Sequence, residues 1–185
     1  MIVGSLARRY AKALLEVADK MGKLDDVAGE LEDVAAVVQS SSELSHALSS
    51  PVFKVSQRKA ILEDLAVRRG LAKEVKIFLA MLADRERTDA LPGIARELRH
   101  MVDERLGRVR ATVTSAKALT ADQEKRIKSA LEKQTGKQVL IEKREDATLI
   151  GGIVTQIGDM VWDGSVKQQL EEMKETILKE EQHFA

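Results

Sequence analysis

Hydrophobic residues recur every three to four positions over the first hundred residues of the chain, with polar residues between them. This period is typical of amphipathic helices, which bury one face. Glycine, serine and proline residues separate the periodic segments. The six predicted helices cover residues 5–21, 25–39, 43–48, 56–67, 71–82 and 92–106.

The first, fifth and sixth of these helices have distinctive patterns. In the first helix, the predicted apolar stripe consists of Leu6, Tyr10, Ala13, Leu14 and Val17. In the fifth, apolar residues surround more than one face, which indicates a helix that is either central in the bundle or also in contact with a partner. The sixth is predicted to be the longest and to carry the chain toward a second domain.

After Gly107 the hydrophobic period changes from 3.6 to 2, which predicts a strand over residues 109–113. Thr120 and Gln123 have the spacing of a capping box, and Gly136 is expected to end the helix that they begin. A second strand is predicted over residues 139–143. We therefore expect a mainly α fold, in which an N-terminal six-helix bundle (residues 1–106) is followed by a small α+β C-terminal domain (residues 107–185).

Residues 149–170 predict a hairpin that leads directly into a helix. Apolar positions alternate from Ile153 to Trp162 along the two predicted strands. Gly158 and Asp159 lie between the strands and suit a two-residue turn with glycine at its first central position. One strand is therefore expected to fold back on the next.

The residues on either side of this hairpin predict how its strands are joined to the neighbouring backbone and to the following helix. Gly151 and Gly152 open the first strand and indicate either a β-bulge or a close approach of two backbone segments. Asp163 and Ser165 can each accept a hydrogen bond from a free N–H group at a helix start, so a helix is expected from about residue 165. Its apolar stripe is expected to be buried, and it consists of Val166, Leu170, Met173 and Ile177.

Composition and charge exclude several classes of protein. The chain has 30 basic and 30 acidic residues and no cysteine. A net charge of zero gives no general attraction to nucleic acid or to anionic lipid, and the absence of cysteine excludes disulfides and thiolate metal sites. No apolar run approaches the roughly 20 residues of a membrane-spanning helix. We therefore expect a soluble, cytoplasmic protein that does not bind nucleic acid or insert directly into a membrane.

Charge is nevertheless patterned along the chain. Residues 19–33 contain six acids and two lysines, whereas residues 54–76 contain seven bases and three acids. A basic segment can bind phosphate groups, but this one lacks interleaved aromatic residues. Pairing between helices within the molecule is the simpler explanation.

The sequence contains no recognisable catalytic or cofactor-binding motif. Gly136 and Lys137 are followed by glutamine, where a phosphate-binding loop needs serine or threonine. His46, His100 and His183 lack a spacing that suggests metal ligation. We therefore expect no cofactor, no metal and no enzymatic activity.

Motifs spread over nearly the whole chain resemble the delta subunit of F-type ATP synthases, whose mitochondrial relative is the oligomycin-sensitivity-conferring protein. Residues 7–14, reading ARRYAKAL, resemble the opening helix of that family, and Ser50-Pro51, Phe78-Leu79 and Leu91-Pro92 follow in the expected order. Thr155 and Trp162 depart from the aliphatic residues that the family usually has there. The C-terminal likeness lies in Gly151, Gly152, Gly158, Asp159, Asp163, Ser165, Val166 and Leu170.

This resemblance implies two partners. In the family, the first and fifth helices form a hydrophobic groove that receives the N-terminal helix of one alpha subunit of the catalytic head. By position in the matching motifs, Tyr10, Ala13 and Met81 would line this groove. The C-terminal domain meets the C-terminal ends of the paired b subunits of the peripheral stalk, and residues 151–170 would support its fold.

The expected function is that of a non-catalytic stator subunit, present in one copy per complex. It would link the catalytic head to the peripheral stalk, so that rotation of the rotor is coupled to ATP synthesis and proton transport. We expect it at the cytoplasmic face of the bacterial inner membrane, as a peripheral protein. The alternative is a small helical adaptor unrelated to ATP synthase, which would keep the groove but lack the second partner. An enzyme is the third possibility, and no nucleophile, base or metal cluster supports it.

Overall fold

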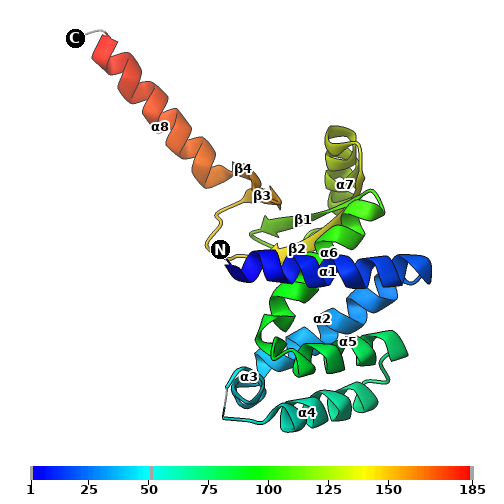
Figure 1. Cartoon of the computed structure of the whole chain (residues 1–185). Helices are drawn as coiled ribbons and strands as arrows, with labels where there is room; N and C mark the ends of the chain where they lie inside the picture. The colour runs from blue at the N-terminus through cyan, green and yellow to red at the C-terminus, as the bar shows by residue number, and fades with distance from the viewer. Residues whose placement is uncertain (1, 51, 184–185) are drawn as a thin grey trace. The chain divides into compact units, whose positions relative to one another are not determined.

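The computed structural model describes residues 2–50 and 52–183, with side chains described for residues 4–50 and 52–174. Pro51 and the side chains of Ile177 and His183 lie outside the described residues. The chain divides into two compact units, residues 1–105 and 106–185 (Figure 1). The fold is mainly helical with a small C-terminal sheet, which confirms the predicted fold class at that level.

The first unit consists of helices. The predicted sixth helix is confirmed, but it is shorter than α1, with 15 residues against 19, so the prediction that it is the longest was wrong. Helices α4 and α5 form a helical hairpin (Figure 1). The elements are α1 (Ile2–Lys20), α2 (Leu24–Ser40), α3 (Ser42–Ser49), α4 (Val55–Arg68), α5 (Lys73–Asp84), the 3-10 turn η1 (Thr88–Ala90) and α6 (Leu91–Arg105).

The buried stripe of α1 differs from the predicted one. The core side chains are Ala7, Ala11, Leu14 and Ala18, of which only Leu14 was expected. Small residues let two helices approach closely, and a Cβ on Gly93 of α6 would lie 3.6 Å from the Cβ of Ala7. Helix α1 therefore packs tightly on α6.

Helix α5 is buried on one side only. Phe78 and Leu79 are in the core, whereas Ile77 is 59% exposed and Met81 is 37% exposed. Of the two alternatives predicted for this helix, a central position in the bundle does not fit the exposed Ile77 and Met81, and contact with a partner remains open. One face of this helix is free to contact a partner.

Charged residues of the acidic segment pair within the first unit. The guanidinium of Arg99 on α6 lies 2.6 Å from the Glu32 carboxylate and 3.3 Å from Asp25, both on α2. The carboxylate of Glu30 accepts a hydrogen bond from the backbone N–H of Ala72, just before α5. These contacts hold α2 against α6 and α5, as the simpler explanation of the charge pattern predicted.

The second unit contains a four-stranded sheet with the order β2-β1-β3-β4. Strand β1 pairs in parallel with β2 and antiparallel with β3. Helix α7 connects β1 to β2 along the chain. Strands β3 and β4 form the predicted hairpin, and α8 begins directly after β4. The elements are β1 (Arg108–Ser115), α7 (Ala121–Thr135), β2 (Gln138–Glu145), β3 (Gly152–Ile157), β4 (Met160–Ser165) and α8 (Val166–His183).

Helix α7 has both ends predicted from the sequence. The Thr120 hydroxyl accepts from the Gln123 N–H at 3.3 Å, and the Gln123 side chain accepts from the Thr120 N–H at 2.9 Å, which completes the capping box. Gly136 ends the helix with a φ of +66°. Leu131 packs from α7 onto Val139 and Ala111 of the sheet.

Candidate partner-binding surfaces

The first candidate site is an apolar surface shared by α1 and α5. We define this α1–α5 surface by Tyr10, Ala13 and Val17 of α1 and by Ile77 and Met81 of α5. Residues three, four and seven apart share one helix face, so the three α1 residues lie along one line and the two α5 residues along another. The two helices meet at the contact described next.

Tyr10 joins the two helices. Its ring meets the ring of Phe78 edge to face, with centroids 6.4 Å apart and an interplanar angle of 72°. The guanidinium of Arg9 lies 5.7 Å from the centroid of the Tyr10 ring, within the range of a cation–π contact. The half-buried Tyr10 is therefore held by its own molecule and still presents part of its ring to solvent.

The three residues that the resemblance assigned to the groove have different surroundings. Tyr10 contacts α5, whereas Ala13 is exposed and Met81 lies one helical turn beyond Phe78. Sequence reasoning missed Ile77 as a surface residue and Phe78 as the contact of Tyr10. The spacing of Ile77 and Met81, four residues apart, was the signal for the exposed face of α5.

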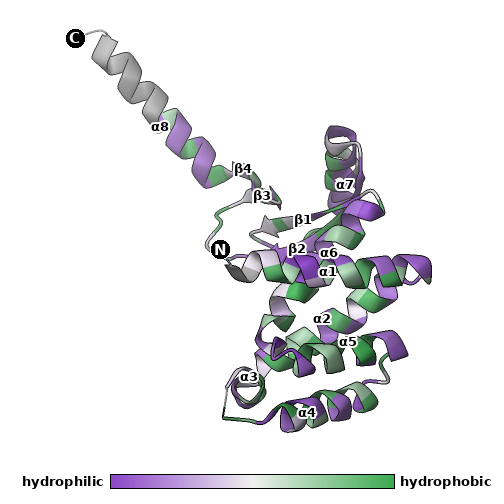
Figure 2. Cartoon of the chain, in the orientation of Figure 1, coloured by the Kyte–Doolittle hydropathy of each residue, from purple (hydrophilic) through white to green (hydrophobic). Residues whose placement is uncertain are grey.

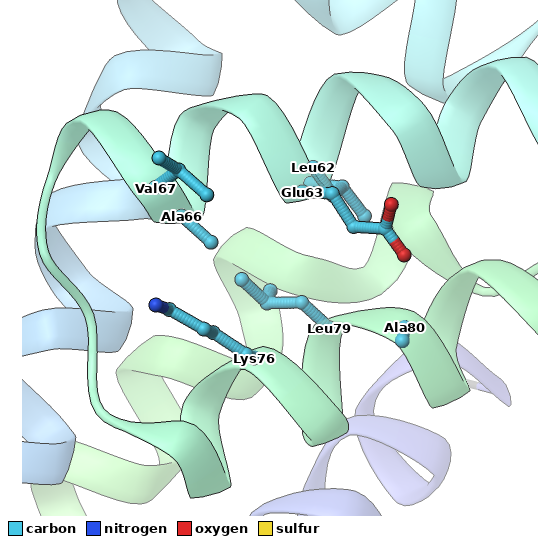
Figure 3. Close-up of a pocket in the computed structure, with 7 residues that line it drawn as sticks. All are labelled: Leu62, Glu63, Ala66, Val67, Lys76, Leu79 and Ala80. Carbon is cyan, nitrogen blue, oxygen red and sulfur yellow. The ribbon is translucent and has the colours of Figure 1, made fainter.

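A separate feature, an apolar recess, lies between α4 and α5 (Figure 3) and was not predicted. Its volume is about 210 Å³, and its floor is apolar, with Leu62, Ala66 and Leu79 buried. Glu63 and Lys76 lie toward opposite ends of this recess in Figure 3. The recess is small beside the roughly 300–1,000 Å³ of ordinary small-molecule sites.

In the second unit, the glycine pair allows β3, β4 and α8 to meet. The backbone N–H of Val166 donates to the C=O of Gly151 at 3.0 Å. Gly152 has a φ of +81°, and a Cβ there would lie 2.2 Å from the backbone oxygen of Gly164 and 2.8 Å from the Cα of Ser165. The predicted close backbone approach is therefore confirmed, and only glycine fits at position 152.

The turn and the helix start also follow the prediction. Gly158 has a φ of +56°, and Ile157 pairs with Met160 across the two-residue turn that Gly158 and Asp159 form. The Ser165 hydroxyl accepts from the N–H of Gln168 at 3.2 Å, at the start of α8.

Asp163, near the end of β4, also contributes a hydrogen bond at the start of α8. Its carboxylate accepts a hydrogen bond of 2.8 Å from the backbone N–H of Ser165. Hydrogen bonds from Ser165 lower the pKa of Asp163 below its ordinary value of 3.8, because they stabilise the ionised carboxylate. Asp163 is thus a structural acid that fixes the passage from β4 to α8.

The apolar stripe of α8 is exposed in the isolated chain. Leu170 is 54% exposed and Met173 is 61% exposed, so the predicted burial of this stripe does not occur within the described residues. Hydrophobic and hydrophilic residues alternate along the described part of α8 (Figure 2). Met160 and Val161 of β4 are also exposed, which gives the second unit its own apolar surface.

The described residues contain no cluster of three or more histidine, cysteine, aspartate or glutamate side chains that could hold a metal ion. His46 and His100 are exposed. Within the described part of the chain, no helix is long and apolar enough to span a membrane.

An apolar surface on the helical unit and another on the α+β unit define a two-part, mainly helical protein that acts by binding. The family model for the ATP synthase delta (OSCP) subunit matches residues 6–177. The chain belongs to this family, which confirms the resemblance stated from its motifs. It is accordingly a structural subunit of an F-type ATP synthase rather than an enzyme in its own right.

Individual relatives agree with this membership. ATP synthase subunit delta of Anaeromyxobacter dehalogenans is 39% identical over 177 residues, which cover 96% of this chain and 99% of the relative. The same subunit of Myxococcus xanthus is 40% identical over 94% of this chain and 97% of its own. Among solved structures, a chain of the Toxoplasma gondii mitochondrial ATP synthase hexamer matches with a TM-score of 0.68 and 27% identity, covering 94% of this chain and 97% of that one. The alternative of an unrelated adaptor is left without support.

Proposed function

We propose that this subunit is a stator component that links the catalytic head of ATP synthase to its peripheral stalk. Its first unit holds the N-terminal helix of an alpha subunit, and its second unit holds the C-terminal ends of the b subunits. One copy serves each complex, at the cytoplasmic face of the bacterial inner membrane. By preventing the head from turning with the rotor, it couples rotation to ATP synthesis and proton transport.

The observation that carries this proposal is the α1–α5 surface. The contact between Tyr10 and Phe78 brings two helices together, and the neighbouring Ala13, Ile77 and Met81 remain exposed. An amphipathic helix can lie in such a surface with its own apolar residues three or four positions apart. Ala13 leaves room for the incoming helix, and Met81 adapts to its shape. This chemistry fits an alpha-subunit helix better than a charged or extended ligand.

The second unit supplies a separate attachment. The stripe of Val166, Leu170 and Met173 is exposed and lies on one face of α8. Burying it against the helical ends of the b subunits would remove apolar surface from water. Because the two attachments lie on different units, a chain engaged at both is held more tightly than at either alone.

The first experiment is a calorimetric titration of the full chain with a synthetic peptide of the cognate alpha subunit's N-terminal helix. We expect saturable one-to-one binding. Ala13→Glu should weaken it at least about tenfold, or about 1.4 kcal/mol, because it brings a charge into an apolar contact. Ala13 is exposed and glutamate favours helices, so the fold is expected to stay intact.

Ala60→Glu is the matched control, because Ala60 is an exposed alanine of α4, a helix that contributes no residue to the α1–α5 surface. It makes the same change in charge and should leave the affinity unchanged. Equal loss for both variants would indicate a general effect of charge and would contradict the groove. The absence of binding by the folded wild-type chain would remove the head-side assignment.

A further inference from the structure

The two edges of the sheet in the second unit differ in their protection. Strands β2 and β4 are the edges of the order β2-β1-β3-β4. Residues 142–145 of β2 are four consecutive charged and exposed residues, and charged side chains discourage an edge from pairing with another strand. Strand β4 has Asp163 as its one charged residue and leaves Met160 and Val161 almost 60% exposed. The β4 edge is therefore the unprotected one.

The register of the hairpin assigns the backbone groups of β4. Ile157 and Met160 close the two-residue turn, and in an antiparallel ladder hydrogen-bonded pairs alternate with pairs that are not hydrogen-bonded. Met160 and Trp162 therefore bond to β3. The N–H and C=O groups of Val161 and Asp163 point away from β3 toward the open edge.

Asp163 does not shield these groups. Its carboxylate is held 2.8 Å from the backbone N–H of Ser165, so it is folded back along its own chain. Val161, Asp163 and Gly164 are all exposed, and α8 therefore leaves this edge uncovered. Two outward-facing residues thus offer four backbone hydrogen-bonding groups in a row.

We propose that a short extended segment of a partner subunit pairs with β4 and adds a fifth strand to the sheet. The segment is mostly apolar, because Met160 and Val161 present apolar side chains on opposite faces of the edge. It carries a basic residue, because Asp159 and Asp163 are the charged side chains of this turn and strand. In such strand addition, main-chain hydrogen bonds supply affinity and alternate side chains supply specificity.

This inference deepens the proposed function and rests on it, because the segment is taken to belong to another subunit of the same ATP synthase. The α8 stripe offers a partner side-chain contacts alone. The β4 edge adds backbone pairing beside that stripe. The partner of the second unit would thus contact it in two ways, as a helix and as a strand.

Amide hydrogen exchange tests the strand directly. The full chain is compared in two states, free and rebound to ATP synthase from which this subunit has been removed. Exchange is followed by mass spectrometry at single-amide resolution. The amides of Val161 and Asp163 should slow at least about tenfold, while those of Met160 and Trp162, already bonded to β3, change much less. Slowing across the α1–α5 surface reports the head-side attachment separately.

A pair of variants isolates the backbone donor. Val161→Pro removes the outward N–H without removing a bond to β3, and proline is tolerated on edge strands. Val161→Thr keeps both the donor and the preference for strands. We expect the Val161→Pro chain to dissociate from the complex about tenfold faster than wild type, and the Val161→Thr chain to stay within about threefold, since interface changes act mainly on dissociation.

Three outcomes would overturn the inference. Unchanged exchange at Val161 and Asp163 in a complex that protects the α1–α5 surface would exclude the strand and leave the proposed function standing. If both Val161 variants dissociated equally fast, and faster than wild type, the result would indicate side-chain contact with a helix instead. A concentration-dependent dimer of the free chain, abolished by Val161→Pro, would assign the edge to a second copy. Failure of the wild-type chain to rebind at all would instead refute the proposed function.

Discussion

Every element of the first unit contributes buried hydrophobic residues to one core, whereas the buried hydrophobic residues described in the second unit are Ala111, Val113, Leu131, Val139 and Ile157. The first unit is thus stabilised mainly by side-chain packing. The second depends more on backbone geometry, on the capping of α7 and α8 and on the glycine pair at the start of β3. A unit with little core tolerates few changes to its backbone, and it gains more from a partner that covers its exposed surface.

The largest expected effect comes from a single methyl group in the second unit. Gly152→Ala should destabilise that unit by about 4 kcal/mol, combining about 1–3 kcal/mol for the positive φ with a similar cost for overlap with the backbone of β4. Thermal unfolding followed by circular dichroism should show the transition of the second unit shifted down and that of the first unchanged.

Gly22→Ala is the control, because Gly22 also has a positive φ, of +66°, but nothing lies within 4 Å of its added Cβ. We expect it to cost about 1 kcal/mol in the first unit, from conformation alone. Similar costs for the two variants would show that backbone crowding is not what holds the hairpin together.

In the first unit, loss of packing should be the costly change. Leu98 is fully buried on α6, so Leu98→Ala should lower the free energy of unfolding of this unit by about 3 kcal/mol, within the range of about 2–5 kcal/mol for such truncations. Denaturant titration measures it. Leu170→Ala removes the same atoms from an exposed site on α8 and should change stability by less than about 0.5 kcal/mol. A large cost at Leu170 would mean that α8 packs within the free chain.

The smallest expected effect is a loss of stability at acidic pH, when Asp163 becomes protonated. The pKa of Asp163 is lower in the folded chain than in the unfolded one, so its contribution to stability is present above the ordinary value of 3.8 and is lost as the pH falls through the folded pKa. The shift of the Ser165 amide in NMR spectra should titrate with a midpoint below 3.8, and Asp163→Asn should abolish that titration. Asp159→Asn should leave it in place, and a midpoint above 3.8 would contradict the hydrogen-bonding argument.

The sequence predicted the helices and the hairpin well because their signals are local. Gly158 and Asp159 define a turn by themselves, and Thr120 and Gln123 define a helix start. The stripe of α1 was misassigned because hydrophobicity gave more weight to Tyr10 and Val17 than to the alanines that pack on α6. Alanine is weakly hydrophobic, and its value there is its small size, which only the approach of α6 reveals.

The candidate surfaces were harder to predict from the sequence, because they too depend on contacts between distant elements. The exposure of Ile77 depends on which side of α5 meets the bundle, and periodicity alone did not establish it. The open edge of β4 depends on strand order, which is a property of the whole sheet. Both surfaces become visible only when elements distant in the sequence are placed together.

The absence of a loop between β4 and α8 has a mechanical consequence. A pull on α8 reaches β4 directly at Ser165, and it loads the hairpin in shear when it is directed along the strand. Strand β4 then slides against β3, so the paired positions from Gly152 opposite Ser165 to Ile157 opposite Met160 resist the load in shear, all at once. A strand pulled sideways would instead lose its bonds one by one, like a zipper. Tension directed along β4 therefore meets the direction in which this small sheet is strongest.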